Sequence, residues 1–228
     1  MKLAVDIHHL LLEHAGTKRV TLNILEQLRT MPDIELIEFK PFYSLSSGKG
    51  IFAKIYGHFI RFFWVQIHLP ILCLIKGVDF LLSPEYYTPV YTNCKRGVIA
   101  HDAHIRAQRE FINPVWFYSY YVPVIERAIR KADLIFTVSK YSKKQIVDLM
   151  YLDNSKVHVV YNGVDKCFTE KVENGIQSNQ TVPCGLTKKE YILFVGTFEA
   201  RKNIERLIQA FGLFKERSGI KGSKIKLA

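Results

Sequence analysis

Short apolar runs alternate along the chain with longer stretches of helical periodicity. Runs typical of β-strands occupy residues 3–7, 34–39, 80–82, 97–100, 134–138, 157–161 and 191–195. Several, such as 134–138, are apolar nearly throughout, as in strands covered on both faces of a parallel sheet. Between them, apolar residues at helical spacing form single faces, for example Val20, Ile24, Leu25 and Leu28. The alternation predicts an α/β fold with a parallel sheet.

The periodic pattern weakens after residue 161. Asn162-Gly163 is a turn signal, and residues 166–189 are polar, contain glycine and lack periodicity. We therefore predict a first domain over 1–165, a linker over 166–190, and a second domain over 191–228. This last piece holds one strand, one helical pattern and the start of another strand. Units below about 40 residues rarely fold alone, so we expect it to be the incomplete start of a domain.

Composition supports a globular protein that stays in the cytoplasm. Of the 228 residues, 48% are hydrophobic and 23% charged, which is enough to build a core. The four cysteines are far apart and form no CxxC pair, so neither a disulfide scaffold nor a zinc ribbon is indicated. The N-terminal residues lack the long apolar region of a secretory signal.

The net charge of +11 leaves three classes of partner open: nucleic acid, an anionic membrane surface and phosphate-bearing small molecules. The cations are spread through α/β elements without a nucleic-acid recognition motif, so we expect no nucleic-acid partner. Residues 59–75 are the most apolar stretch, but polar residues and a proline interrupt a run already shorter than the roughly 20 residues of a membrane span.

Cations beside this stretch favour a helix that lies on a membrane. Lys54, His58 and Arg61 stand among aromatic and aliphatic residues, which would give a helix with an apolar face and a basic edge. The three residues are therefore a candidate membrane surface. The alternative is that the same apolar face packs on the sheet.

A candidate phosphate site follows the last complete strand. The strand ends at Gly196, Arg201 and Lys202 stand side by side in the following loop, and Asn203 precedes a helix. A helix N-terminus with neighbouring cations suits a phosphate group, and open α/β sheets bind ligands at the carboxyl ends of their strands. Gly16, after the first strand, would also allow close approach of an anion. The alternative is a solvated loop whose cations have no role.

A second candidate site follows the strand over 97–100. It delivers His101, Asp102 and His104 to the end of the strand. Zinc needs three or four ligands and the spacing offers no third, so we expect no metal here. His101 is a candidate for hydrogen bonding to a substrate, with Asp102 as a candidate orienting residue. A helix-capping Asp beside a structural His is the alternative.

The order of these motifs resembles that of a known family. Residues 132–142, residues 156–165 with Phe168, and residues 195–204, preceded by Ser83-Pro84 and His101-Asp102, resemble the retaining GT-B glycosyltransferases of family 4. The resemblance covers essentially the whole chain and implies two Rossmann-like domains, of which the second is represented by its first β-α-β portion.

The resemblance also implies an activity. Similar enzymes transfer a hexosyl group from a nucleotide-sugar, held by the second domain, to a glycan or lipid-linked acceptor, held by the first, at the cytoplasmic membrane face. It implies catalytic roles for His101, Arg201 and Lys202, and donor-phosphate binding by Gly16, Gly196, Arg201 and Lys202. The sequence has no DxD triplet, which fits a metal-independent mechanism without a cofactor.

Two features depart from the family pattern. Thr197 stands where many members carry an arginine directly after the glycine, and the sequence ends before the family's Glu-containing motif. The alternative function is therefore a catalytically inactive, truncated module that binds an acceptor or a membrane surface.

Overall fold

The computed structural model describes residues 1–11, 15–42, 51–164, 190–196, 198, 202–223 and 225–228, without the side chains of 15, 51–54 and 220–223. The chain divides into two compact units, Met1–Gly163 and Val164–Ala228. Each unit is described by itself below.

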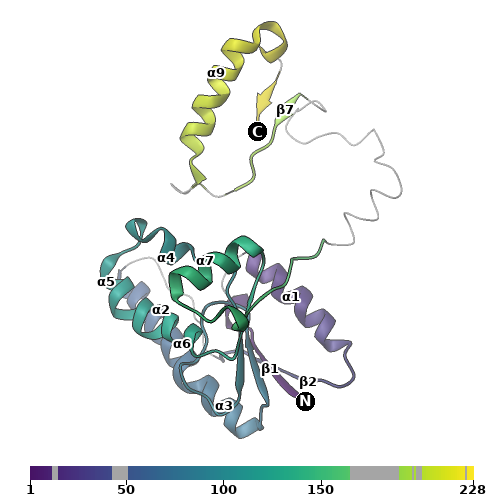
Figure 1. The fold of residues 1–228 in the computed structure, drawn as a ribbon, viewed down its shortest axis with the longest axis vertical. Coiled ribbons are helices and arrows are strands. Elements are labelled where there is room, and N and C mark those ends of the chain that lie inside the picture. The colour runs from purple at the N-terminus through teal and green to yellow at the C-terminus, as the bar shows by residue number, and fades with distance from the viewer. Residues whose placement is uncertain (12–14, 43–50, 165–189, 197, 199–201, 224) are drawn as a thin grey trace. The chain divides into compact units, whose positions relative to one another are not determined.

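The first unit is built on one parallel six-stranded sheet with the strand order β2-β1-β3-β4-β5-β6 (Figure 1). Its strands are β1 (Lys2–Asp6), β2 (Glu35–Phe39), β3 (Phe80–Ser83), β4 (Lys95–Ile99), β5 (Leu134–Thr137) and β6 (Val157–Val159). The register pairs Leu3 with Leu36 on one side and with Phe80 on the other. Every strand overlaps one of the predicted apolar runs, with ends that differ by up to two residues, and the predicted parallel α/β sheet is confirmed.

Two long helical runs contain π-helical segments. The α-helices of this unit are α1 (Ala15–Arg29), α2 (Ile51–Phe63), α3 (Leu69–Lys76), α4 (His104–Ala107), α5 (Pro114–Trp116), α6 (Arg127–Arg130) and α7 (Lys140–Met150). The π-helical segments are η2 (Trp64–His68) and η4 (Phe117–Glu126), and the 3-10 turns are η1 (His8–Leu11), η3 (Arg109–Phe111) and η5 (Asn154–Lys156). Thus α2, η2 and α3 form one continuous run, and α5, η4 and α6 form another.

Helices cover both faces of the sheet. On one face, Ala4 and Leu81 pack against buried side chains of η2 and α3, and Val98 packs against those of η4, α6 and α7. On the other face, Leu3 and Val5 pack against Leu25 of α1. Figure 1 shows α1 on the opposite side of the sheet from α2 and α3. Alternate residues of each strand therefore enter different cores, as the two-residue period of a strand requires.

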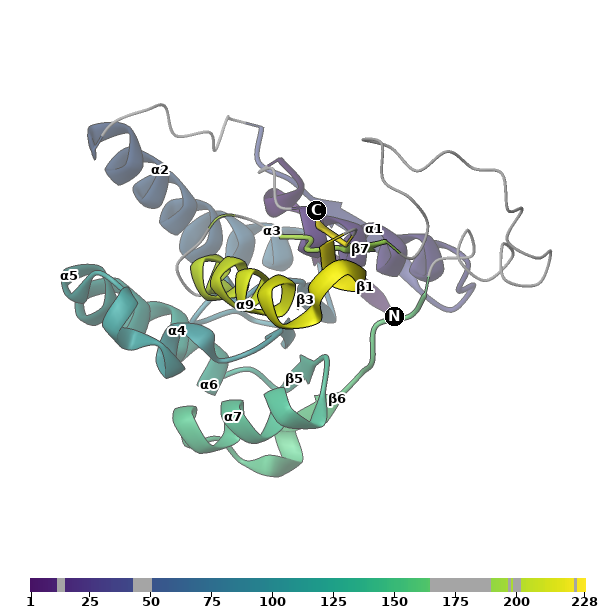
Figure 2. The same cartoon turned by 90° about the horizontal axis from the view of Figure 1, so that it is seen from above.

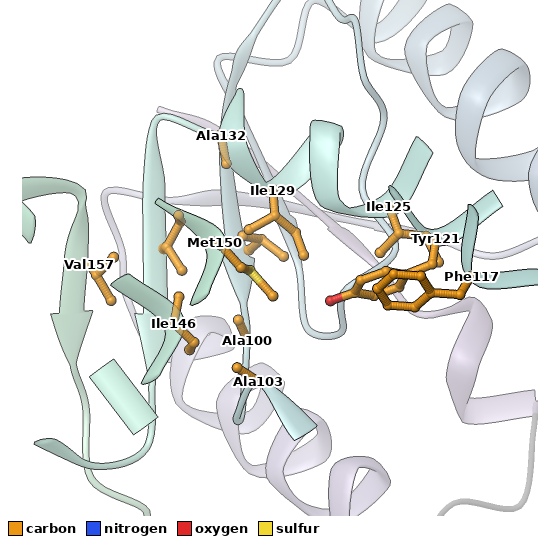
Figure 3. Packing of buried hydrophobic residues seen from close by; sticks show 12 residues of the cluster. Ala100, Ala103, Phe117, Tyr121, Ile125, Ile129, Ala132, Ile146, Met150 and Val157 are labelled. Atoms are coloured by element: carbon orange, nitrogen blue, oxygen red, sulfur yellow. The ribbon is translucent and has the colours of Figure 1, made fainter. Parts of the chain in front are cut away.

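The core beneath η4 and α7 is shown in Figure 3. The rings of Phe117 and Tyr121 stack with centroids 5.2 Å apart, while Ile146 and Met150 of α7 pack into the same cluster. The first turn of α7 is capped by Ser139, whose hydroxyl accepts a hydrogen bond from the Ser142 N–H at 3.0 Å.

Two neighbouring residues fix β4 in the middle of the sheet. A Cβ on Gly97 would lie 2.7 Å from the ring of Phe80, so no larger residue fits there without displacement. Arg96 is only 8% exposed, and its guanidinium donates hydrogen bonds to the backbone carbonyls of Pro89 and Lys131. These bonds tie the loop before β4 to the end of α6.

The second unit contains β7 (Tyr191–Ile192), α9 (Ile204–Ser223) and β8 (Lys226–Leu227). The two strands pair in parallel, and α9 is interrupted at Gly219, where φ is 56°. This arrangement confirms the predicted β-α-β portion. The predicted linker over 166–190 lies outside the described residues except for Glu190, and the predicted domain limits stay predictions.

Candidate functional site

The strand order locates a ligand-binding edge in the first unit. From β1 the chain goes to β2 on one side, and then to β3 on the other side of β1. Doubly wound sheets bind ligands outside the carboxyl ends of their strands, at the point where the order reverses. The carboxyl ends of β1, β3, β4 and β5 all carry polar side chains at this edge.

A buried carboxylate organises the end of β1. Asp6, 1% exposed, accepts hydrogen bonds from the His8 backbone N–H at 3.1 Å, from His8 Nδ1 at 2.8 Å and from Trp64 Nε1 at 3.1 Å. Because Nδ1 donates to Asp6, Nε2 is the ring nitrogen of His8 that is left for another partner. That Nε2 atom is buried and has no hydrogen-bond partner among the described residues.

His101 lies two residues after β4, at the carboxyl end of the strand, as the sequence predicts. Its backbone carbonyl accepts a hydrogen bond from Thr137 Oγ1 at 3.3 Å, and its Nε2 is buried without a partner in the part of the chain that the structure describes. Burial lowers the pKa of His101, while the negative charges of Glu85 and Asp102 raise it less. The ring is therefore held neutral, and Nε2 is available for a hydrogen bond with a ligand.

Asp102 contacts His104 and Tyr86 rather than His101. Its Oδ1 lies 2.5 Å from His104 Nδ1 and accepts a hydrogen bond from the Tyr86 hydroxyl at 2.8 Å. Burial alone would raise the pKa of Asp102, but the hydrogen bonds from His104 and Tyr86 outweigh it and hold the pKa below its ordinary value. The sequence suggests that Asp102 orients His101, whereas in the structure Asp102 hydrogen-bonds to His104.

The predicted donor-phosphate residues lie in both units. Gly16 is in the first turn of α1, where its position is exposed and a Cβ would meet no atom within 4 Å. In the second unit, Gly196 and Lys202 are exposed, on either side of residues that the structure does not describe. Asn203 precedes α9, and its carbonyl accepts a hydrogen bond from the Leu207 N–H at 3.2 Å. Arg201 lies outside the described residues.

The three residues predicted for a membrane surface all belong to α2. The Lys54 side chain lies outside the described part of the chain. His58 is exposed, with its ring 6.3 Å from that of Trp116, and Arg61 lies over Tyr87 with 4.8 Å between the guanidinium carbon and the ring centroid. Figure 2 shows α2 and α5 side by side. His58 and Arg61 therefore face the α5–η4 run and the loop after β3.

Sequence reasoning missed His8 and Tyr87 as site residues. His8 follows a buried strand directly, so the rule that selected His101 would also have selected it. Tyr87 follows β3 after a proline and carries no comparable signal, because aromatic residues are frequent throughout this chain.

An apolar pocket also lies near the carboxyl edge of the sheet. It has a volume of about 210 Å³, lies between α1 and the sheet, and is lined by Ile24, Leu82, Ile99 and Phe136, with Asn162 from the end of the first unit. Across residues 1–11, 15–42 and 51–164 and the described part of the second unit, no three His, Cys, Asp or Glu side chains gather as a metal site.

Comparisons with known proteins identify the family. A glycosyltransferase from Rickettsia africae ESF-5 is 17% identical, with a TM-score of 0.40, over 95% of this chain and 57% of that one. The chain thus spans 57% of the length of this solved structure. No curated protein matches the sequence. The sequence profile of Glycosyltransferase Family 4 matches residues 16–166, which is more than half of the chain. The chain therefore belongs to Glycosyltransferase Family 4.

Proposed function

We propose that this chain acts in the transfer of a hexosyl group from a nucleotide-sugar to a glycan or lipid-linked acceptor, with retention of configuration. The bond between the sugar C1 and the donor phosphate breaks, a bond between C1 and the acceptor oxygen forms, and the acceptor hydroxyl proton leaves with the nucleoside diphosphate. The observation that carries the proposal is His101: in a family of glycosyltransferases, it offers a neutral ring at the carboxyl end of β4, and its Nε2 has no partner among the described residues.

The donor diphosphate is assigned to cations of the second unit. Negative charge grows on the diphosphate as the glycosyl bond breaks, and cations placed beforehand at that position lower the barrier. Arg201 and Lys202 supply this charge, Gly196 and Gly16 allow close backbone approach, and the reaction proceeds without a metal. The exposed position of Lys202 before α9 supports this assignment.

Nucleotide binding tests the proposal directly. Titration of the full chain with UDP and with GDP, followed by calorimetry, should detect binding of one of them. Arg201→Ala and Lys202→Ala should each weaken it several-fold or more, because a hydrogen bond to a charged group contributes about 1.5–3 kcal/mol. Arg217→Ala, at an exposed cation on α9, is the matched control and should bind as the wild type does. Absence of nucleotide binding by the wild type, or equal binding by all variants, would overturn the proposal.

A cytoplasmic location on the inner face of the cytoplasmic membrane is the second part of the proposal. The run Ile55–Lys76 is long and apolar enough to cross a membrane, but Trp64, Leu69 and Cys73 are buried in the core and Trp64 is bonded to Asp6. Other side chains of the run are exposed, among them Phe59 (64%), Leu74 (66%) and Ile75 (70%). A helix packed on the sheet through one side and apolar on the other suits the membrane interface.

Sedimentation with vesicles of phosphatidylglycerol and phosphatidylcholine tests this location. The double variant Phe59→Asn, Leu74→Asn should lose most of its vesicle binding, because apolar area in the interface supplies the attraction. Leu22→Asn, at an exposed position of α1, is the control and should sediment as the wild type does. Undiminished binding of the double variant would contradict this location.

A further inference from the structure

An unpaired cation lies at the point where the strand order reverses. Arg61 reaches from α2 to Tyr87, which follows β3, and its guanidinium carbon is 4.8 Å from the Tyr87 ring centroid. Its Nε is buried, and no hydrogen bond or ion pair joins Arg61 to any residue that the structure describes. Stacking on a tyrosine orients a guanidinium but leaves all five of its N–H donors free.

A second unpaired group lies against the same tyrosine. The His8 ring is 1% exposed, and its centroid is 6.1 Å from that of Tyr87, at an interplanar angle of 80°. Asp6 holds His8 through Nδ1, and Nε2 has no partner among the described residues. Two buried nitrogen atoms from α2 and from the end of β1 thus approach one ring, each without the partner that buried polar groups normally have.

No described carboxylate lies within ion-pair distance of Arg61. Asp6 already accepts three hydrogen bonds, from His8 and Trp64. Tyr120 of η4 is close enough for Arg61 to lower its pKa, although burial and Tyr87 raise that pKa more. A partly buried guanidinium without a counter-charge is costly, and an anionic ligand would remove that cost.

We infer that Arg61 and His8 bind an anionic group of the acceptor, a phosphate or phosphodiester, while the ring of Tyr87 holds the guanidinium in place. The planar guanidinium matches two oxygens of such a group, and His8 Nε2 is the second hydrogen-bonding atom available to it. The position between β1 and β3 is the switch point at which a doubly wound sheet binds its ligand. The inference rests on the proposed function, because sugar transfer is what gives the first unit an acceptor.

Tryptophan fluorescence of the full chain can report this binding. The chain has two tryptophans. Trp64 donates a hydrogen bond to Asp6, and the Trp116 ring lies 6.1 Å from that of Tyr120. We would titrate the protein with inorganic phosphate, glucose 1-phosphate and farnesyl phosphate, and expect saturable binding of at least one probe. Arg61→Met should weaken that binding by about tenfold or more, as loss of a charge-assisted hydrogen bond predicts.

Two further variants make the result interpretable. Arg127→Met is the matched control, because Arg127 also lies over a tyrosine, Tyr91, at 5.9 Å, but donates a hydrogen bond to its hydroxyl. It should bind the probes as the wild type does. Arg61→Lys keeps the positive charge but cannot bind two oxygens at once, so this variant should bind the probes with intermediate affinity. If Arg61→Met does not fold, Arg61→Lys takes its place in the comparison.

Each outcome decides the inference. Arg61-dependent binding of farnesyl phosphate alone supports a lipid-linked acceptor, and Arg61-dependent binding of phosphate or glucose 1-phosphate supports a soluble one. Absence of binding by the wild type, or equal affinity of Arg61→Met and wild type, would overturn the inference. UDP and GDP titrations of Arg61→Met separate the phosphate site from the donor site, because nucleotide binding by this variant should equal that of the wild type. Absence of nucleotide binding in the wild type and all variants would instead count against the proposed function.

Discussion

Two glycines of the first unit have opposite steric surroundings. Gly97 lies between the rings of Phe80 and Phe136, at 2.7 and 3.2 Å from the position of a Cβ, whereas Gly16 has open space around it. A substitution at Gly97 therefore disturbs the sheet, while one at Gly16 disturbs only whatever approaches the first turn of α1.

Replacing each glycine by alanine should separate fold from function. Gly97→Ala should lower the free energy of unfolding by about 1–3 kcal/mol, the usual cost of an overpacked core. Gly16→Ala should leave the free energy of unfolding unchanged or raise it by up to about 1 kcal/mol, since alanine favours the helix. The same substitution should weaken nucleoside diphosphate binding. Urea unfolding and calorimetry measure both effects. A stable Gly97→Ala, or full nucleotide affinity in Gly16→Ala, would contradict these assignments.

Stability should depend on pH through His101. Because the pKa of His101 is lowered in the folded protein, the unfolded chain takes up the proton first as pH falls below about 6.5. The contribution of the neutral ring is therefore complete above that pH and is lost as pH falls through the folded pKa. Thermal unfolding of wild type and His101→Gln between pH 5 and 8 should converge toward pH 5. A constant difference between the two proteins would show that His101 stays unprotonated or unperturbed.

Single residues were predictable only where one strand delivers them. His101 and Asp102 stand next to a buried strand, so the sequence places them at the carboxyl edge. Arg61, His8 and Tyr87 come from three elements, and only the folded sheet brings them together. Charge and aromatic content near residue 61 indicated a surface but could not distinguish a membrane from a ligand.

At the scale of elements, strands were easier to predict than the helical runs. Each of the six strands overlaps a short run of mainly apolar residues, so its pattern is local. In the π-helical segments η2 and η4, the wider turn changes which side of the helix the following residues face. The pattern of apolar residues does not predict where such a segment occurs. Strand order depends on pairing between distant segments and likewise required the structure.

The run from α2 to α3 is held on the sheet by its inner residues. Trp64→Phe should lower the free energy of unfolding by about 1–3 kcal/mol, because the buried Asp6 carboxylate loses the hydrogen bond from Nε1. Vesicle binding should be retained, since the exposed side of the run is unchanged. Chemical denaturation with a far-UV readout measures the first, and sedimentation the second. Unchanged stability would mean that this helix is not fixed through Trp64.

For the whole molecule, the chain divides into Met1–Gly163 and Val164–Ala228, and the proposed function places the acceptor in the first unit and the donor diphosphate in the second. The first unit has its own sheet and cores on both faces. Residues 1–163 expressed alone should therefore unfold cooperatively and keep the Arg61-dependent phosphate response, but should not bind UDP or GDP. Near-UV circular dichroism and the same titrations check this. Nucleotide binding by residues 1–163 would place the donor site in the first unit.

The hydrogen bonds of the Arg96 guanidinium determine which positions around β4 can change in sequence. Its guanidinium donates to backbone carbonyls at Pro89 and Lys131, not to side chains. A carbonyl is present whatever residue occupies those positions, so mutation at 89 or 131 leaves the connection intact. A mutational scan should therefore find position 96 intolerant of replacement and its two partners tolerant, which lets the loop after β3 drift in sequence while keeping its course toward the switch point.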